Sequence, residues 1–131
     1  MADMAGPVQI LVVDDEEPIR NALKKFLQQQ QFDVYAAGSG DEALQQLKRH
    51  RIALMLCDIR MPGTSGVDLV PAAIEIEPEL AILMLTAVND ATSAALCMQR
   101  GAMDYLTKPI ELADLGSAVQ RALKRDRKSV V

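Results

Sequence analysis

The sequence has few aromatic residues and almost no histidine. It contains two Phe, two Tyr, no Trp and one His in 131 residues, although half of the residues are hydrophobic. The core must therefore be built from aliphatic side chains, and a site made of stacked rings is disfavoured. The single histidine, His50, has no acid or nucleophile beside it in the sequence. Any histidine chemistry must come from another protein.

The sequence also lacks an excess of basic residues and a long hydrophobic run. Fourteen Lys and Arg face eighteen Asp and Glu, which leaves a net charge of -4 and argues against direct binding of nucleic acid. No apolar run approaches the roughly 18 residues of a membrane span, and Asp3 stands where a signal peptide carries bases. We therefore expect a cytoplasmic domain that binds neither nucleic acid nor a membrane.

The two cysteines do not form a recognisable metal or redox motif. Cys57 and Cys97 are 40 residues apart, lie among apolar neighbours and have no partners for a four-ligand zinc site. We expect both to be reduced and buried.

Five short apolar segments alternate with amphipathic segments of helical period. The first segment ends at Asp14, and after Pro18 an apolar stripe at helical spacing predicts a helix. Ser39 and Glu42 have the spacing of a helix-capping box, and Gly101 stops a later helix. Pro71 fits its helix only in the first turn, or else it bends that helix. The predicted strands are residues 8–13, 32–37, 52–57, 80–85 and 102–106.

This alternation predicts an α/β fold with a doubly wound, five-stranded parallel sheet and helices on both faces. The continuous hydrophobicity of the third strand suits a sheet that is covered on both sides. We expect one domain at residues 8–124, a tail at residues 1–7, and a basic linker or truncated continuation at residues 125–131.

Polar side chains follow four of the five predicted strands. Ligands of such sheets bind outside the carboxyl ends of the strands, so these residues are expected at one rim. The second strand ends in inert small residues instead. The rim residues are Asp14 and Asp15 after the first strand, Asp58 after the third, Thr86 after the fourth, and Thr107 and Lys108 after the fifth.

Three carboxylates and one lysine at the same rim favour binding of a divalent cation. The carboxylates would otherwise repel one another, and Mg²⁺ prefers such oxygen ligands. Beside the ion, Lys108 and the Thr86 hydroxyl would stabilise a phosphoryl group, and an aspartate would serve as the nucleophile. Each feature alone has an ordinary interpretation: an acidic first helical turn, a loop acid, a surface lysine or a helix cap. The joint placement at strand ends argues for a site.

Four motifs resemble the receiver domain of two-component response regulators, in order and spacing. The likeness covers residues 8–124 and implies a chemotaxis-regulator-like, flavodoxin-like three-layer sandwich with strand order 2-1-3-4-5. Ile110 departs from the pattern, since Phe is common there, and Pro71 interrupts a helix that usually runs without proline. The motifs are Val12-Val13-Asp14-Asp15-Glu16, Asp58-Ile59-Arg60-Met61-Pro62-Gly63, Thr86-Ala87 and Tyr105-Leu106-Thr107-Lys108-Pro109.

The resemblance implies that Asp58 is phosphorylated by the phosphohistidine of a sensor histidine kinase or phosphotransfer protein. It also implies that Thr86 and Lys108 hold the phosphoryl oxygens, and that Tyr105 rotates inward when Thr86 moves. The protein would then be a signalling phosphoacceptor that catalyses only its own phosphorylation and dephosphorylation. The Lys108–Pro109 peptide is expected to be cis. The implied Mg²⁺ ligands are Asp14, Asp15, Asp58 and the carbonyl of Arg60.

Other interpretations remain open. A flavodoxin-like FMN module would need a hydroxyl-rich phosphate loop and rings for the flavin. A small phosphatase of the haloacid dehalogenase type would need a second acid two residues after its nucleophile, where Glu16 stands, and usually has a longer chain. Among receivers, the choice lies between a stand-alone shuttle and the front of a longer protein with an output domain beyond Val131. The basic end, which has no helix stop signal, favours the longer protein.

The fourth helix is rich in alanine and poor in charge, which predicts an exposed apolar patch for a partner. We expect phosphorylation to remodel the face of the fourth helix, fifth strand and fifth helix, so that it binds an output domain or a second receiver as a homodimer. The alternative is that the small residues only allow close packing on the sheet. The expected patch comprises Ala91, Ala94, Ala95, Met98, Met103 and Tyr105, rimmed by Arg100 and Asp104.

Overall fold

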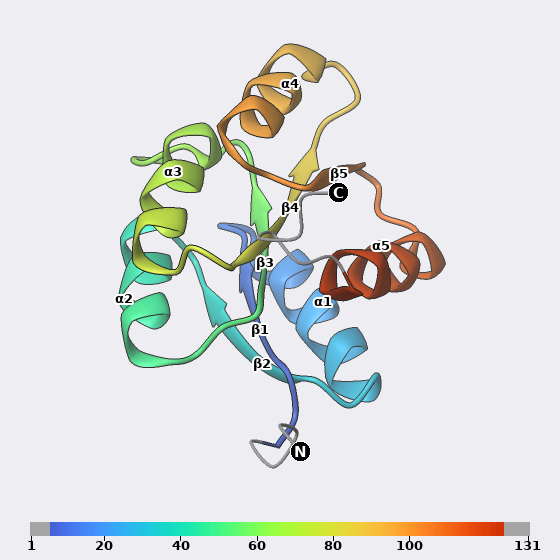
Figure 1. The fold of residues 1–131 in the computed structure, drawn as a ribbon. Coiled ribbons are helices and arrows are strands. Elements are labelled where there is room, and N and C mark those ends of the chain that lie inside the picture. Colours follow the sequence, from blue (N-terminus) through green and yellow to red (C-terminus); the bar gives the residue numbers. More distant parts are fainter. Residues whose placement is uncertain (1–5, 125–131) are drawn as a thin grey trace.

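A five-stranded parallel sheet forms the centre of the computed structural model, which describes residues 6–124 (Figure 1). The strands lie in the order β2-β1-β3-β4-β5, and every neighbouring pair is parallel. This confirms the predicted fold class and strand order. The strands are β1 (Gln9–Val13), β2 (Asp33–Ala37), β3 (Leu54–Asp58), β4 (Ala81–Thr86) and β5 (Asp104–Thr107).

Five helices cover the two faces of this sheet (Figure 1). Two of them, α1 and α5, pack on one face, and α2, α3 and α4 pack on the other. None of the helices within residues 6–124 is long and apolar enough to span a bilayer. The helices are α1 (Glu17–Gln29), α2 (Gly40–Arg49), α3 (Gly66–Ile76), α4 (Ala91–Arg100) and α5 (Leu112–Lys124).

The central strands bury both of their faces. In β3, Met55 and Cys57 pack toward α2, α3 and α4, whereas Leu54 and Leu56 pack toward α1 and α5. This arrangement explains the unbroken hydrophobicity of the segment. Cys57 and Cys97 are both buried and unbonded, as expected, and burial raises the pKa of the Cys57 thiol far above its ordinary value.

The strand boundaries agree with the predicted ones to within two residues, and β1 and β2 end at the predicted residues. The ladder between β3 and β4 continues through the pair Asp58 and Leu85, and the ladder between β4 and β5 continues through Thr86 and Thr107. Three polar residues at the rim are therefore the last residues of their strands. Because their backbones are hydrogen-bonded in the sheet, their side chains have fixed starting points.

Pro71 lies inside α3 rather than in its first turn, which excludes the first of the two placements that the sequence left open. Proline has no N–H to donate to the carbonyl four residues earlier, which here belongs to Val67. The guanidinium of Arg100 donates to that carbonyl at 3.3 Å and also pairs with Asp68 at 3.2 Å. A side chain from α4 thus replaces the missing donor and links α3 to α4.

The ends of two helices follow the predicted signals. The Ser39 hydroxyl accepts a hydrogen bond from the Glu42 N–H at the start of α2, and Gly101 ends α4 with φ of 128°. The Lys108–Pro109 peptide is cis, as the resemblance implied. The expected linker at residues 125–131 and most of the expected tail lie outside the described residues.

Candidate functional site

The ends of β1 and β3 bring three carboxylates together. One carboxylate oxygen from each of Asp14, Asp15 and Asp58 lies within 4.8 Å of the other two. Asp14 and Asp58 are buried, whereas Asp15 is exposed, so the cluster is open to solvent on one side. The adjacent ends of two parallel strands place these acids on a single rim, where the sequence predicted them.

Lys108 joins two of these acids from the loop after β5. Its Nζ lies 3.1 Å from Asp58 and 3.3 Å from Asp14. Backbone N–H groups hold the other carboxylate oxygens, since Glu16 donates to Asp14 at 2.9 Å and Arg60 donates to Asp58 at 3.2 Å. Both buried acids are therefore fixed by one ammonium group and one amide each.

The electrostatics of the cluster favour a further cation. Burial raises the pKa of Asp58, and although Lys108 opposes this effect, the pKa stays above its ordinary value. Burial alone would lower the pKa of Lys108, but Asp58 and Asp14 together outweigh it and raise that pKa. Lys108 is a single cation beside three carboxyl groups, so the cluster can take a further cation.

The donor set fits Mg²⁺. This ion prefers oxygen ligands, takes one or two carboxylates and keeps several waters. Asp14, Asp15 and Asp58 offer such oxygens around one point, and the exposed side at Asp15 leaves room for waters and a phosphoryl oxygen.

The start of α3 packs directly against the backbone of Asp58. A Cβ on Gly66 would lie 2.5 Å from the Asp58 carbonyl oxygen and 2.8 Å from the Ile59 Cα, so only glycine fits there. The Gly66 N–H donates to the Ile59 carbonyl at 2.7 Å. The sequence alone did not predict this role for Gly66, because the close approach arises from the tertiary fold.

Thr86 and Tyr105 lie on neighbouring strands at the same rim. The buried Thr86 hydroxyl donates to the Ala87 carbonyl at 3.2 Å, and the Lys108 N–H donates to the Thr86 carbonyl at 2.8 Å. The Tyr105 ring is 45% exposed. The structure therefore shows the Tyr105 ring in an outward position, with the Thr86 hydroxyl bound to its own chain.

Two further residues at the rim were missed by the sequence reasoning. The Arg20 guanidinium donates to the Asp14 carbonyl at 2.8 Å and so supports the acidic loop. Asp90 is buried and pairs with the exposed Arg60 side chain at 2.8 Å. The ion pair joins residues 30 positions apart, so only a known fold would have predicted it.

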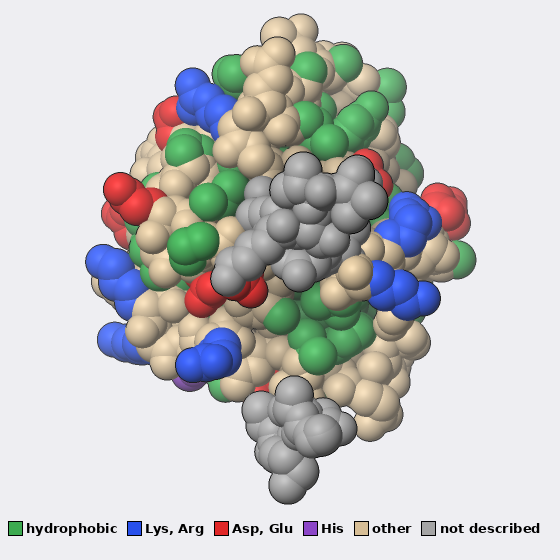
Figure 2. Space-filling view, in the orientation of Figure 1, with side chains coloured by type: hydrophobic (Ala, Val, Ile, Leu, Met, Phe, Trp, Pro, Cys, Tyr) green, Lys and Arg blue, Asp and Glu red, His purple; other side chains and the backbone are tan. Residues whose placement is uncertain are grey.

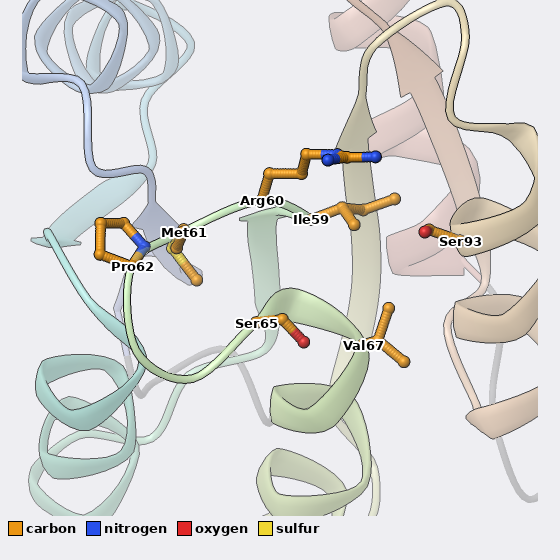
Figure 3. A pocket seen from close by; sticks show the side chains of 7 residues that line it. All are labelled: Ile59, Arg60, Met61, Pro62, Ser65, Val67 and Ser93. Atoms are coloured by element: carbon orange, nitrogen blue, oxygen red, sulfur yellow. The ribbon is translucent and has the colours of Figure 1, made fainter.

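A cavity of about 570 Å³ opens beside this ion pair (Figure 3). It lies between the loop after β3, the start of α3 and the first turn of α4. Figure 3 shows Arg60 at its rim and Ser93 facing it from α4. The lining residues are Ile59, Arg60, Met61, Pro62, Ser65, Val67 and Ser93.

The expected apolar patch on α4 is only partly present. Ala94 is buried and Met98 packs on the core cluster beneath α4, so neither is a free surface residue. Met103 packs on the opposite cluster, with α1 and α5, and was wrongly assigned to the patch. Figure 2 shows hydrophobic side chains over α4 at the top of the view. We give the name apolar face of α4 to five exposed residues on and next to this helix: Val88, Ala91, Ala95, Leu96 and Tyr105.

Comparison with known proteins gives a consistent family match. A family model described as the response regulator receiver domain matches residues 10–120. The DNA-binding transcriptional regulator NtrC of Azospirillum brasilense is 35% identical over 114 residues, or 87% of this chain and 24% of the relative. The response regulator protein PilR of Pseudomonas aeruginosa is 37% identical over 87% of this chain and 26% of the relative. The chain thus spans about a quarter of the length of these relatives.

Solved structures share the whole fold. A response regulator receiver domain protein from Clostridium thermocellum has a TM-score of 0.86 and 34% identity, covering 90% of this chain and 95% of that chain. NtrX from Brucella abortus also has a TM-score of 0.86, at 29% identity, covering 90% of this chain and 27% of that one. The matched region contains every residue of the carboxylate cluster and Lys108.

Proposed function

The chain belongs to the response regulator receiver domain family, and on that premise we propose that it accepts a phosphoryl group on Asp58 from a phosphohistidine. The donor is a sensor histidine kinase or a phosphotransfer protein, since the only histidine of this chain, His50, ends α2 and stacks on Tyr35. The observation that carries the proposal is the position of Asp58, within 4.8 Å of two other carboxylates and 3.1 Å from Lys108.

In the proposed reaction, a carboxylate oxygen of Asp58 attacks phosphorus while the bond from phosphorus to the histidine nitrogen breaks. The imidazole keeps the electron pair, and an aspartyl phosphate forms. Mg²⁺, held by Asp14, Asp15, Asp58 and the Arg60 carbonyl, would neutralise the acids and the phosphoryl oxygens. Lys108 gives up its contact with the Asp58 carboxylate and binds a phosphoryl oxygen. Hydrolysis by water returns the carboxylate and releases inorganic phosphate.

The Thr86 hydroxyl is proposed as the second ligand of the phosphoryl oxygens and as the start of the switch. It now donates to the Ala87 carbonyl, so it would have to rotate toward Asp58. That movement would vacate space beside β4 for the Tyr105 ring, which is now 45% exposed. A ligand shifts such an equilibrium through contacts made in one state only, and the Thr86 hydrogen bond is such a contact.

The protein is proposed to act as a signalling phosphoacceptor rather than as a phosphatase. The acid after the first strand, which would be the nucleophile of a haloacid dehalogenase-type enzyme, is Asp14. It is fully buried, and its two carboxylate oxygens accept from Glu16 and Lys108. Asp58 retains some exposure and is the better placed nucleophile.

The face formed by α4, β5 and α5 is the proposed output surface. Its partner is an output domain, a separate protein or a second receiver. The curated relatives are about three and a half times as long as this chain, which supports an output domain beyond Val131 and a linker role for residues 125–131. A stand-alone shuttle is the alternative arrangement.

The direct test is phosphorylation by acetyl phosphate in the presence of Mg²⁺. Intact-mass analysis is expected to show the addition of one phosphoryl group to the parent and none to Asp58→Asn. Asp68→Asn, which changes an exposed acid on α3, is the matched control and is expected to be modified like the parent. Equal modification of Asp58→Asn and the parent would remove the assignment.

A further inference from the structure

Asp90 stands at the start of α4 but does not cap the helix. Asp is among the residues that most favour the N-cap position, because its carboxylate accepts from the free N–H groups of the first turn. Here the Asp90 side chain makes no capping hydrogen bond to the backbone. Its Oδ2 instead accepts from the Arg60 Nε at 2.8 Å, so in its present orientation the carboxylate serves Arg60 and not the helix.

The two partners of this ion pair have very different surroundings. The Asp90 side chain is 6% exposed, whereas the Arg60 side chain is 75% exposed. Arg60, and then the Ser93 hydroxyl, lower the pKa of Asp90, so the carboxylate is ionised at neutral pH. The acid is fixed in the protein, and the exposed guanidinium is the partner that is free to move.

Arg60 is also attached to the phosphoacceptor through its backbone. Its N–H donates to Asp58 at 3.2 Å, while its side chain reaches to α4. Figure 3 shows this side chain extending from the loop after β3 toward the end of β4. One residue therefore connects Asp58 with the first turn of α4.

We propose that the Arg60 side chain exchanges partners when Asp58 is phosphorylated: it releases Asp90 and binds the phosphoryl group. The released Asp90 carboxylate then caps α4. The inference rests on the proposed function, since it needs a phosphoryl group on Asp58. Arg60 and Asp90 are thereby positioning residues that transmit the state of Asp58 to α4, in addition to Thr86 and Tyr105.

The charges at the site favour this exchange. Phosphorylation converts the Asp58 carboxylate, with one negative charge, into an acyl phosphate that carries about two negative charges on its phosphoryl oxygens. Arginine binds phosphate oxygens with two parallel N–H groups, a geometry that the single Nε contact with Asp90 does not use. The vacated Asp90 carboxylate is not left unpaired, because the first-turn N–H groups and the helix dipole stabilise it.

The test follows the backbone amides of Thr92 and Ser93, which are the donors that an Asp90 cap would bind. Their ¹⁵N-¹H signals are recorded with and without Mg²⁺ and beryllofluoride as the phosphoryl mimic. We expect the mimic to move both signals in the parent. Arg60→Met frees Asp90 to cap α4. Without any mimic, this variant is therefore expected to shift both signals in the same direction as the mimic does in the parent, by at least half of that shift.

Two variants separate capping from proximity to the site. Asp90→Ala removes the acceptor, so the mimic is expected to produce less than half of the parent's movement at Thr92 and Ser93. Asp90→Asn keeps a capping side chain but weakens the hold on Arg60, so it is expected to resemble Arg60→Met. Arg121→Met is the control. It removes an exposed arginine that lies 3.8 Å from Asp104, and it is expected to leave the Thr92 and Ser93 signals unchanged.

The same exchange predicts a change in affinity for the mimic. Since Arg60 must leave Asp90 before it binds the phosphoryl group, Asp90→Asn is expected to bind beryllofluoride about two- to fivefold more tightly, as suits an ion pair with one exposed partner. Equal affinity of Asp90→Asn and the parent for beryllofluoride would contradict the exchange. So would Thr92 and Ser93 signals that the mimic shifts as far in Asp90→Ala as in the parent. Phosphorylation of Asp58 with unmoved α4 signals would overturn the exchange and leave the proposed function intact. Absence of phosphorylation would overturn both.

Discussion

Lys108 reaches Asp58 across the end of an intervening strand. The 3.1 Å ion pair joins the loop after β5 to the last residue of β3, and β4 lies between these two strands in the sheet. The lysine is therefore tied to the phosphoacceptor from a position next to Tyr105 and the output surface. Any change in the charge of Asp58 is felt directly at the end of β5.

Lys108→Met is expected to slow phosphorylation of Asp58 by acetyl phosphate. The substitution removes the cation that opposes the burial-induced rise in the pKa of Asp58, and it removes a ligand of the phosphoryl oxygens. A loss on the order of 100-fold is typical when one such electrostatic partner is removed. Initial rates by intact-mass analysis measure the effect, with Lys124→Met on α5 as the control. A rate within twofold of the parent would show that Lys108 is not part of the site.

Asp58→Asn is expected to stabilise the metal-free protein at neutral pH. Because the pKa of Asp58 is raised in the folded state, that state binds the proton more tightly than the unfolded chain does. The stability of the parent therefore falls as the pH rises from the unfolded pKa through the folded pKa, whereas the asparagine variant has no such loss. Single stabilising substitutions commonly raise the free energy of unfolding by about 0.5–2 kcal/mol, and we expect a gain of this size from removing the buried charge.

Urea denaturation at several pH values tests this prediction. The stability difference between the variant and the parent should be near zero well below pH 4, where the carboxyl is protonated in both states, and should reach its full size at neutral pH. Added Mg²⁺ should stabilise the parent more than the variant and so reduce the gap. A difference that does not change with pH would contradict the linkage to Asp58 ionisation.

Mg²⁺ binding is expected to depend on the exposed acid of the cluster. Asp15→Asn replaces one carboxylate oxygen within the 4.8 Å group by an uncharged amide. Loss of a residue that only supports a metal ligand commonly lowers metal affinity by roughly 10- to 100-fold. Asp15 is proposed as a direct ligand, so we expect the affinity for Mg²⁺ to fall by at least that much. Isothermal titration calorimetry measures the affinity, and Glu17→Gln, at the first residue of α1, is the control. Phosphorylation that persists in excess chelator would rule out the proposed metal.

The sequence predicted the parts of the site that depend on where strands end. Asp14, Asp58 and Lys108 follow apolar runs, and parallel strands must place their carboxyl ends at one rim. These positions needed no knowledge of side-chain contacts. The predicted strand order came from the motif resemblance, because periodicity alone does not determine which strands are neighbours.

The sequence did not predict contacts that depend on side-chain direction at segment ends. Met103 was placed with Tyr105 by strict alternation, but it precedes β5 and packs on the opposite face. No role for Asp90 could be predicted, because its ion pair with Arg60 forms only when the loops after β3 and β4 come together. Arg100 compensates for Pro71 in the same way, through a contact that only packing of α4 on α3 creates.

Thr86 and Tyr105 are expected to change position together when Asp58 carries a phosphoryl group. In the present structure the Thr86 hydroxyl binds the Ala87 carbonyl and the Tyr105 ring is 45% exposed. Crystal structures with and without Mg²⁺ and beryllofluoride should show the hydroxyl turned to the mimic and the ring turned inward. Thr86→Val, which keeps the shape but has no hydroxyl, should bind the mimic while Tyr105 stays outward. A Tyr105 ring with one orientation in every structure would place the switch elsewhere.

The apolar face of α4 is expected to drive self-association of the activated protein. The test needs an exposed member of this face, because a charge at Met98 or Met103 would enter the edge of a packed cluster and destabilise the fold. Leu96 is 37% exposed in the middle of α4, so Leu96→Glu adds charge at the surface without disturbing the core. Burial of one leucine at an interface is worth about 1.5–3 kcal/mol, so the association constant should fall about tenfold or more. Sedimentation velocity with Mg²⁺ and beryllofluoride measures it.

Leu112→Glu is the matched control for that variant. Leu112 is 45% exposed, begins α5 and lines a groove with Phe26 of α1, so it tests the α5 part of the output surface separately from α4. Phosphorylation of Asp58 should be equal in both variants, since neither residue lies at the rim. Weakened association in Leu96→Glu alone would identify the apolar face of α4 as the contact between receivers. Weakened association in Leu112→Glu alone would move the contact to α1 and α5, and the hydrophobic residues over α4 would then have to serve a different partner.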